Sequence, residues 1–331
     1  MKDRRDIYQF TIALVILIVV FILSICIGRY KISIKDFGNI LLNRELDSTT
    51  KMVFFHLRLP RAIMVIVGGI GLGISGSIYQ TIFKNPLATP DIMGVASGAN
   101  LGAAIAIIFL SAGSFTIAFT AFLGGLLAVF AAIGLTNLSR DKGISSIVLA
   151  GIVISSLTQG IIMMLKYFAD PERQLAALEF WAMGSFAGIT SHKLISIVPF
   201  FLLGLILLLL LRWQINILSL SDDEGRSLGV NVTVIRTIAI IAATLVVASI
   251  VSVTGLISFI GLIAPHIGRM IRKKNDFSTG ILSGVIGAII LTAADVLARS
   301  VSSSEIPISI LTTFIGAPYL AYLIVIQNRR L

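Results

Sequence analysis

Charged residues are scarce in this sequence: aspartate, glutamate, lysine and arginine make up only 13% of its 331 residues. An average soluble domain carries about 25% charged residues. Hydrophobic residues account for 56% of the chain, and the mean hydropathy is +1.00. This composition excludes a soluble enzyme or binding domain. It predicts an all-α polytopic membrane protein with about ten spans, formed as one transmembrane domain over residues 1–331.

Residues that could build a chemical site are also few. The single cysteine, Cys26, lies in the first apolar run, which excludes a disulfide framework and a thiolate metal site. His266 has no cysteine, aspartate or second histidine at ligand spacing. The sequence contains no Walker A motif, so this chain does not bind ATP through a P-loop. We therefore expect no cofactor, no metal site and no catalytic residue.

Two apparent nucleotide signals have simpler explanations. A GxGxxG pattern at 71–76 lies inside an apolar run, with no preceding strand and no acid at the expected distance. Gly69, Gly73 and Ser77 recur at helical spacing and instead predict a face for close helix packing. The net charge of +10 does not indicate a nucleic-acid partner, because the basic residues lie between apolar runs, where they set topology.

The apolar runs define the expected spans. The eighth is short and is either tilted or partly re-entrant. The first follows a basic start but is long for a signal peptide and lacks a small-residue cleavage site, so we interpret it as an uncleaved span. A short extra helix is expected within 179–189. The spans are expected at about 8–28, 60–83, 92–111, 115–137, 144–165, 193–212, 232–254, 257–271, 280–302 and 306–327.

The distribution of lysine and arginine predicts the orientation. With the N-terminus inside, 15 of the 26 basic residues fall in inner segments, and seven of the other 11 lie between Arg29 and Arg61. Outside that basic stretch the ratio is 15 to 4, so both termini are expected in the cytoplasm. The basic stretch itself is either a solvated connector or a surface that receives an acidic partner.

Residues 218–231 form a polar island between the sixth and seventh spans. The three consecutive acids at 222–224 would each cost several kcal/mol in hydrocarbon, so the island must lie outside the lipid. Ser221 and Glu224 have the spacing of a capping box, and Gly229 is a stop signal. The island therefore predicts a short helix on the cytoplasmic surface.

Charged residues also occur at the start of the second span and near the end of the ninth, on the side of the membrane opposite the polar island. Arg58 and Arg61 flank the start of the second span. Within the ninth span, Asp295 lies roughly 22 Å and Arg299 roughly 28 Å from its start, close to the far edge of the membrane core. Their i,i+4 spacing lets them pair on one helix face. These residues serve either as structural anchors and an ion pair or as a docking site for another protein.

The sequence resembles the FecCD-type permeases, the transmembrane subunits of ABC importers for iron-siderophores, haem and cobalamin. The resemblance covers nearly the whole chain, in order and at the family's spacing. Its motifs are LRLPR (57–61), NPLATPDIMGVASGA (85–99), SDDEGRSLGV (221–230), GLISFIGLIAPHIGR (255–269), ADVLAR (294–299) and EIPI (305–308).

This resemblance implies ten spans, a second permease subunit that is identical or different, and a substrate path between the two subunits. It also implies two kinds of protein partner. ABC ATPase subunits would receive the cytoplasmic loop at about 216–231, whose coupling residues are Ser221, Asp222, Asp223, Glu224, Gly225, Arg226, Leu228 and Gly229. An extracytoplasmic substrate-binding protein would dock on Arg58, Arg61 and Arg299.

The expected function is therefore that of a permease in the cytoplasmic membrane, surrounded by lipid, which imports a chelated iron complex using the ATPase subunits' energy. Family frequency favours an iron-siderophore over haem or cobalamin as the cargo. The rival classes are a secondary transporter or channel and a membrane scaffold. Only Asp295 resembles the midplane charge of a secondary transporter, and it has a local partner.

Overall fold

The protein is described from a computed structural model that covers residues 2–28, 30, 32–42, 47–110, 113–140, 143–302 and 304–328. Residues 29, 31, 44, 111, 142 and 329–331, on which some predicted boundaries and charge counts fall, lie outside these ranges. Helices joined by short connectors make up the described chain, and none of its residues forms a strand. The all-α prediction is confirmed.

Seven of the described helices are long and apolar enough to cross a membrane, and three further helices lie at the other predicted spans, which is roughly consistent with the predicted count of about ten. The seven spanning segments lie within α1 (Lys2–Cys26), α4 (Leu59–Ile82) with the turns before it, α6 (Ser114–Leu138), α7 (Ile144–Phe168), α9 (Ser191–Leu210), α12 (Val232–Thr254) and α14 (Phe277–Ser300). The other three are α5 (Val95–Phe109), α13 (Ile260–Arg272) and α15 (Ile308–Asn328).

Two of the short helices begin after a break in the backbone. A 3-10 turn, η2 (Pro90–Met93), precedes α5, and Gly94 between them has a φ of +82°. The 13 residues of α13 extend only about 20 Å, against about 30 Å of hydrocarbon. Non-helical residues 255–259 precede it, and Phe259 has a φ of +66°. The eighth predicted span is therefore too short to cross as a helix.

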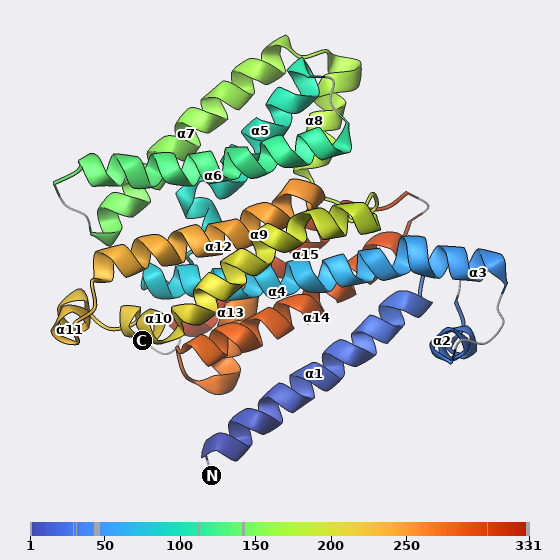
Figure 1. Cartoon of the computed structure of the whole chain (residues 1–331), viewed down its shortest axis with the longest axis horizontal. Coiled ribbons are helices and arrows are strands. Elements are labelled where there is room, and N and C mark those ends of the chain that lie inside the picture. The colour runs from blue at the N-terminus through green and yellow to red at the C-terminus, as the bar shows by residue number, and fades with distance from the viewer. Residues whose placement is uncertain are drawn as a thin grey trace.

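Most of the remaining short helices lie at the two ends of the bundle (Figure 1). At one end, which we call the α3 end, lie α2 (Ile34–Leu41), α3 (Ser48–Met52) and the π-helical turn η1 (Val53–Arg58), which continues into α4. At the other, the α11 end, lie α10 (Arg212–Leu218) and α11 (Asp222–Ser227). The first residues of α1 and the last of α15 also lie toward the α11 end.

A further short helix follows α7. The π-helical turn η3 (Pro171–Leu175) leads into α8 (Ala176–Ala182). A short extra helix was expected here at 179–189, and the helix begins and ends earlier than that range.

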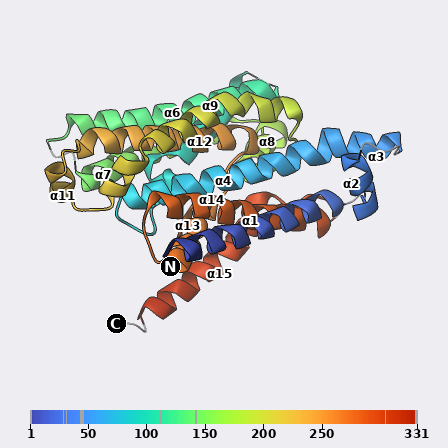
Figure 2. The same cartoon turned by 60° about the horizontal axis from the view of Figure 1, so that its bottom comes forward.

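Helix α4 lies at the centre of the bundle, in contact with α12, α13 and α14. In the turned view it lies between a layer containing α6, α9 and α12 and a layer containing α1, α14 and α15 (Figure 2). A Cβ on Gly69 would overlap the backbone of Ala288, and one on Gly73 would overlap the carbonyl of Ser283. The predicted small-residue face is confirmed, and it allows the α4 and α14 backbones to touch.

We predict that Gly73→Ala destabilises the protein by about 1–3 kcal/mol, because the added methyl group overpacks the contact with α14. The matched control is Gly134→Ala in α6, where a Cβ would meet nothing within 4 Å. Thermal unfolding of the detergent-solubilised protein measures both. Equal melting temperatures for the two variants would contradict this account of the packing.

Candidate functional site

The local structure of α11 follows from its sequence. The Ser221 hydroxyl accepts a hydrogen bond from the Glu224 amide at 3.2 Å, and the Glu224 carboxylate accepts one from the Ser221 amide at 2.8 Å. This confirms the predicted capping box. Gly229, with a φ of +80°, ends the helical segment, and the Val230 amide donates back to the Gly225 carbonyl. Both ends of this six-residue helix are thus fixed by hydrogen bonds.

Two faces of α11 have different surroundings. Gly225 is buried, and a Cβ there would lie 2.8 Å from the Val232 side chain of α12. Asp223 and Arg226 within the helix are exposed, and so is Leu228, which follows its last residue. The buried face seats the helix on the bundle, and the exposed face is available to another protein.

Hydrogen bonds also tune the acids of this helix. Those from the Ser221 hydroxyl and amide hold the pKa of Glu224 below its ordinary value. The lowered pKa keeps the carboxylate ionised, and the helix cap intact, at more acidic pH than for an ordinary glutamate.

Asp222 differs from its neighbours because it has partners inside the chain. Its carboxylate accepts a hydrogen bond from Lys84 Nζ at 2.9 Å, and both of its oxygens accept from Arg236 Nη2 at 2.9 Å. Partial burial would raise the pKa of Asp222, but the hydrogen bonds and charges of Lys84 and Arg236 outweigh it and lower the pKa. From the sequence, Asp222 was expected to be one of the residues that couple to the ATPase subunits. In the structure its carboxylate instead binds Lys84, after α4, and Arg236, in α12.

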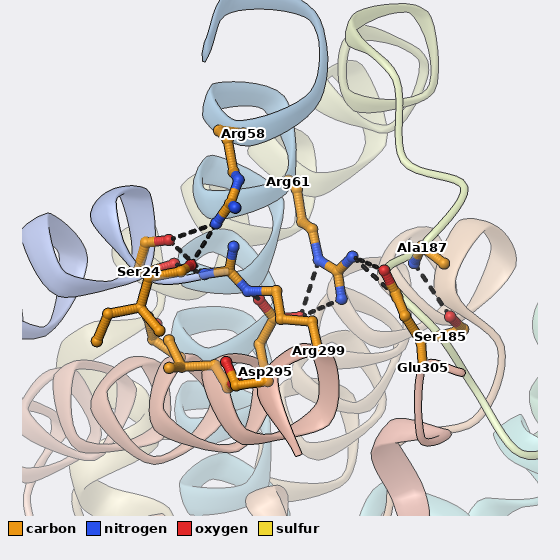
Figure 3. A network of polar contacts seen from close by, with 12 residues as sticks. Ser24, Arg58, Arg61, Ser185, Ala187, Asp295, Arg299 and Glu305 are labelled. Atoms are coloured by element: carbon orange, nitrogen blue, oxygen red, sulfur yellow. Dashed lines mark hydrogen bonds and ion pairs between the residues drawn. The ribbon is translucent and has the colours of Figure 1, made fainter. Parts of the chain in front are cut away.

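A second group of charges lies at the α3 end, and we call it the arginine cluster: Arg58, Arg61, Asp295, Arg299 and Glu305 (Figure 3). Arg61 donates to Asp295 Oδ1 at 3.0 and 2.8 Å and to both oxygens of Glu305 at 2.9 Å. Arg299 Nε lies 3.3 Å from Asp295 Oδ2, one helical turn away. The i,i+4 ion pair expected on α14 is therefore present, with Arg61 as a third member.

Backbone carbonyls complete the arginine cluster. Arg58 donates to the carbonyl of Ile27 and, at 3.0 Å, to that of Tyr30. Arg299 donates to the carbonyl of Ser24 and, at 2.9 Å, to its hydroxyl. The cluster thus joins the end of α1, the start of α4 and the last turns of α14.

Burial of the arginine cluster bears on its expected role. Arg58, Arg61 and Arg299 are 8%, 9% and 5% exposed. The sequence analysis assigned these three arginines to one site, and in the structure they do lie close together. Their guanidinium groups, however, bind carboxylates or carbonyl groups of this chain. This geometry fits the first of the two expected roles, that of structural anchors and an ion pair. Docking of another protein stays a prediction. Sequence reasoning gave no role to Ser24 or Glu305, because only long-range contacts reveal them.

No group of three or more histidine, cysteine, aspartate or glutamate residues in the described ranges is placed to hold a metal ion. The imidazole of His266 packs edge-on against the Tyr319 ring, with 5.8 Å between the ring centroids. The functional candidates in the described chain are therefore the α11 surface and the arginine cluster.

Comparison with known proteins agrees with this architecture. The model of the FecCD transport family matches residues 16–326. This chain belongs to the FecCD transport family. It is similar to a solved inward-facing conformation of a metal-chelate type ABC transporter, at 34% identity and a TM-score of 0.87, covering 96% of this chain and 98% of that one.

Two curated relatives match almost end to end. The molybdate import permease MolB of Haemophilus influenzae is 37% identical, with 93% of each chain covered. The Fe(3+)-citrate import permease YfmE of Bacillus subtilis is 36% identical, with 99% of this chain and 98% of YfmE covered. The chain is therefore a multi-pass membrane permease of the ABC importer class.

We predict that Arg61→Ala lowers the free energy of unfolding by roughly 3–5 kcal/mol, because the buried Asp295 carboxyl group loses both hydrogen bonds from Arg61 and keeps only the longer contact with Arg299. The control is Lys166→Ala, whose pair with Glu179 is more exposed and is worth about 0–1 kcal/mol. Thermal unfolding in detergent measures the difference. A loss no larger than that of the control would show that the arginine cluster does not stabilise the fold.

Proposed function

We propose that this chain is the permease subunit of an ABC importer that moves a chelated iron complex, specifically an iron-siderophore, into the cytoplasm. The whole-length likeness to importer permeases, together with the exposed face of a firmly capped α11, carries the proposal. Relatives named for iron chelatin in Helicobacter pylori and for iron(3+)-hydroxamate in Bacillus subtilis, at 35% and 30% identity, support an iron chelate.

In this proposal the energy comes from separate ATPase subunits, which hold α11 in a groove on their surface. Asp223, Arg226 and Leu228 offer one acid, one base and one apolar side chain on the exposed face. Recognition is of the helix-in-groove kind. A second permease subunit lies beside this one, and both termini are cytoplasmic, at the end that carries α11.

The cargo is tested by transport in proteoliposomes that hold the permease, its ATPase and its binding protein. We expect ATP-dependent uptake of a ferric siderophore. Uptake of haem, cobalamin or molybdate in its place would overturn the iron assignment and leave the importer assignment standing. Uptake driven by an ion gradient without ATP would instead support a secondary transporter.

We predict that Gly225→Pro uncouples the importer. Proline removes the amide that donates to the Ser221 carbonyl, and its ring enters the space beside Val232. The variant should reach the membrane at normal levels but lose cargo uptake and stimulated ATP hydrolysis. Uptake and stimulated hydrolysis at unchanged rates would show that α11 is not the coupling element.

At the other end of the molecule, we propose that the arginine cluster attracts the binding protein. Three guanidinium groups face two carboxylates there, which leaves a net charge of one positive. Such a charge speeds and orients the encounter with an acidic surface even when it is partly covered.

We predict that reversing Arg58 and Arg299 to glutamate slows association of the binding protein by roughly tenfold at low salt, with a smaller effect at high salt. Surface plasmon resonance on the folded complex measures the rate, and Lys166→Glu is the control. Because both arginines are buried, the folded fraction is measured in parallel. An unchanged association rate for folded protein would assign the arginines to structure alone.

A further inference from the structure

The contacts of Asp222 join α11 to the connector that follows α4. Lys84, which bonds Asp222 at 2.9 Å, is the second residue after α4 and has a left-handed φ of +48°. Arg236, the other partner, belongs to the second turn of α12. Two neighbouring helices, α11 and α12, and a connector 138 positions earlier in the sequence therefore meet at one carboxylate.

The Arg236 side of this junction is stronger than the exposed pairs around it, and it fixes the carboxylate that Lys84 also contacts. The Arg236 side chain is 2% exposed, and among the described residues Asp222 is the one carboxylate that pairs with it. Separating Asp222 from Arg236 would leave a buried charge without a partner, which is strongly unfavourable. By contrast, Arg226 and Asp223 lie 4.0 Å apart and are largely exposed. Displacement of α11 therefore acts on its partners through Asp222.

The connector beyond Lys84 is held by short-range hydrogen bonds. The Asn85 amide donates to the Gln80 carbonyl, and the Asn85 side chain accepts from the Leu87 amide at 2.9 Å. Pro86 and Pro90 restrict the backbone further. A connector of this kind transmits a displacement along its length instead of absorbing it.

The connector ends against α7. Its last part, η2, lies so close to this helix that a Cβ on Gly151 would overlap the Ile92 carbonyl. A Cβ on Gly94 would lie 3.1 Å from the Ser155 hydroxyl, also on α7. The same part of the connector, with Asp91, borders a cavity of about 170 Å³ whose other walls include residues 256–259 before α13. The connector is therefore in contact with α7 and also forms part of the wall of this cavity.

We propose that the ion pair between Lys84 and Asp222 transmits the movement of α11 to the 84–94 connector, and through it to α7. The inference rests on the proposed function, because a partner ATPase must move α11. Lys84 is a positioning residue in this scheme: it contacts neither ATP nor cargo. A contiguous set of contacts is the physical route, and coupling through it must be shown by experiment.

The decisive variant is Lys84→Met, which keeps the length of the side chain and removes its charge. The complex should assemble and hydrolyse ATP, while the cargo moved per ATP falls roughly 2- to 30-fold, the effect of about 0.5–2 kcal/mol of coupling. Lys84→Arg should restore the ratio, because a guanidinium can also pair with Asp222. The matched control is Lys166→Met, which breaks a pair of similar exposure in the last turn of α7, away from Gly151 and Ser155, where the connector meets that helix.

A second readout needs no cargo. A spin label on Leu87→Cys, in a Cys26→Ser background, reports movement of the connector, since the Leu87 side chain is 60% exposed. ATP binding to the assembled complex should change the label's mobility with Lys84 present and leave it unchanged in Lys84→Met.

The inference is overturned if Lys84→Met keeps the cargo-to-ATP ratio and the label's response, or if Lys166→Met reduces the ratio equally. It is also overturned if Lys84→Arg fails to restore the ratio. If the wild-type permease binds no ATPase subunit, the proposed function is refuted instead. A complex whose label responds to ATP while no iron chelate is transported would refute only the cargo assignment.

Discussion

Inside a membrane a polar group finds partners only within the protein, and the buried charges of this chain are arranged accordingly. Asp295 is 1% exposed and lies between Arg61 and Arg299, while Arg236 is 2% exposed and reaches Asp222 at the edge of the bundle. Each of these buried charges would destabilise the fold if its partner moved away. The positions of the helices that carry them are therefore linked.

Close contact between helix backbones is the second interaction that holds the bundle together. Without a hydrophobic driving force between helices in lipid, van der Waals packing must hold them together. The glycines of α4 allow it to touch α14 along much of its length, and Gly76 brings it against Gly261 of α13. A central pair packed in this way leaves little room for one helix to shift against the other. Displacement is then easier at the connectors, where α5 and α13 begin after breaks in the backbone.

The two ends of the molecule use ion pairs in different ways. At the α3 end, the arginine cluster ties α1, α4 and α14 together with several bonds and little exposure. At the α11 end, one carboxylate joins the short exposed helix to a connector and to α12, and the remaining acids of that helix cap it or face outward. The first arrangement is nearly closed to solvent, and the second is the one through which we propose that movement is transmitted.

Short-range rules accounted for what the sequence by itself determined. Hydropathy located about ten spans, the Ser221–Glu224 spacing predicted a capping box, and the i,i+4 spacing predicted the Asp295–Arg299 pair, because each depends on residues within a few turns. Only the tertiary structure decided that Arg61 pairs with Asp295, 234 positions away, and that Asp222 turns inward to Lys84 and Arg236. Such partners are set by how whole helices pack, and no local spacing in the sequence encodes that.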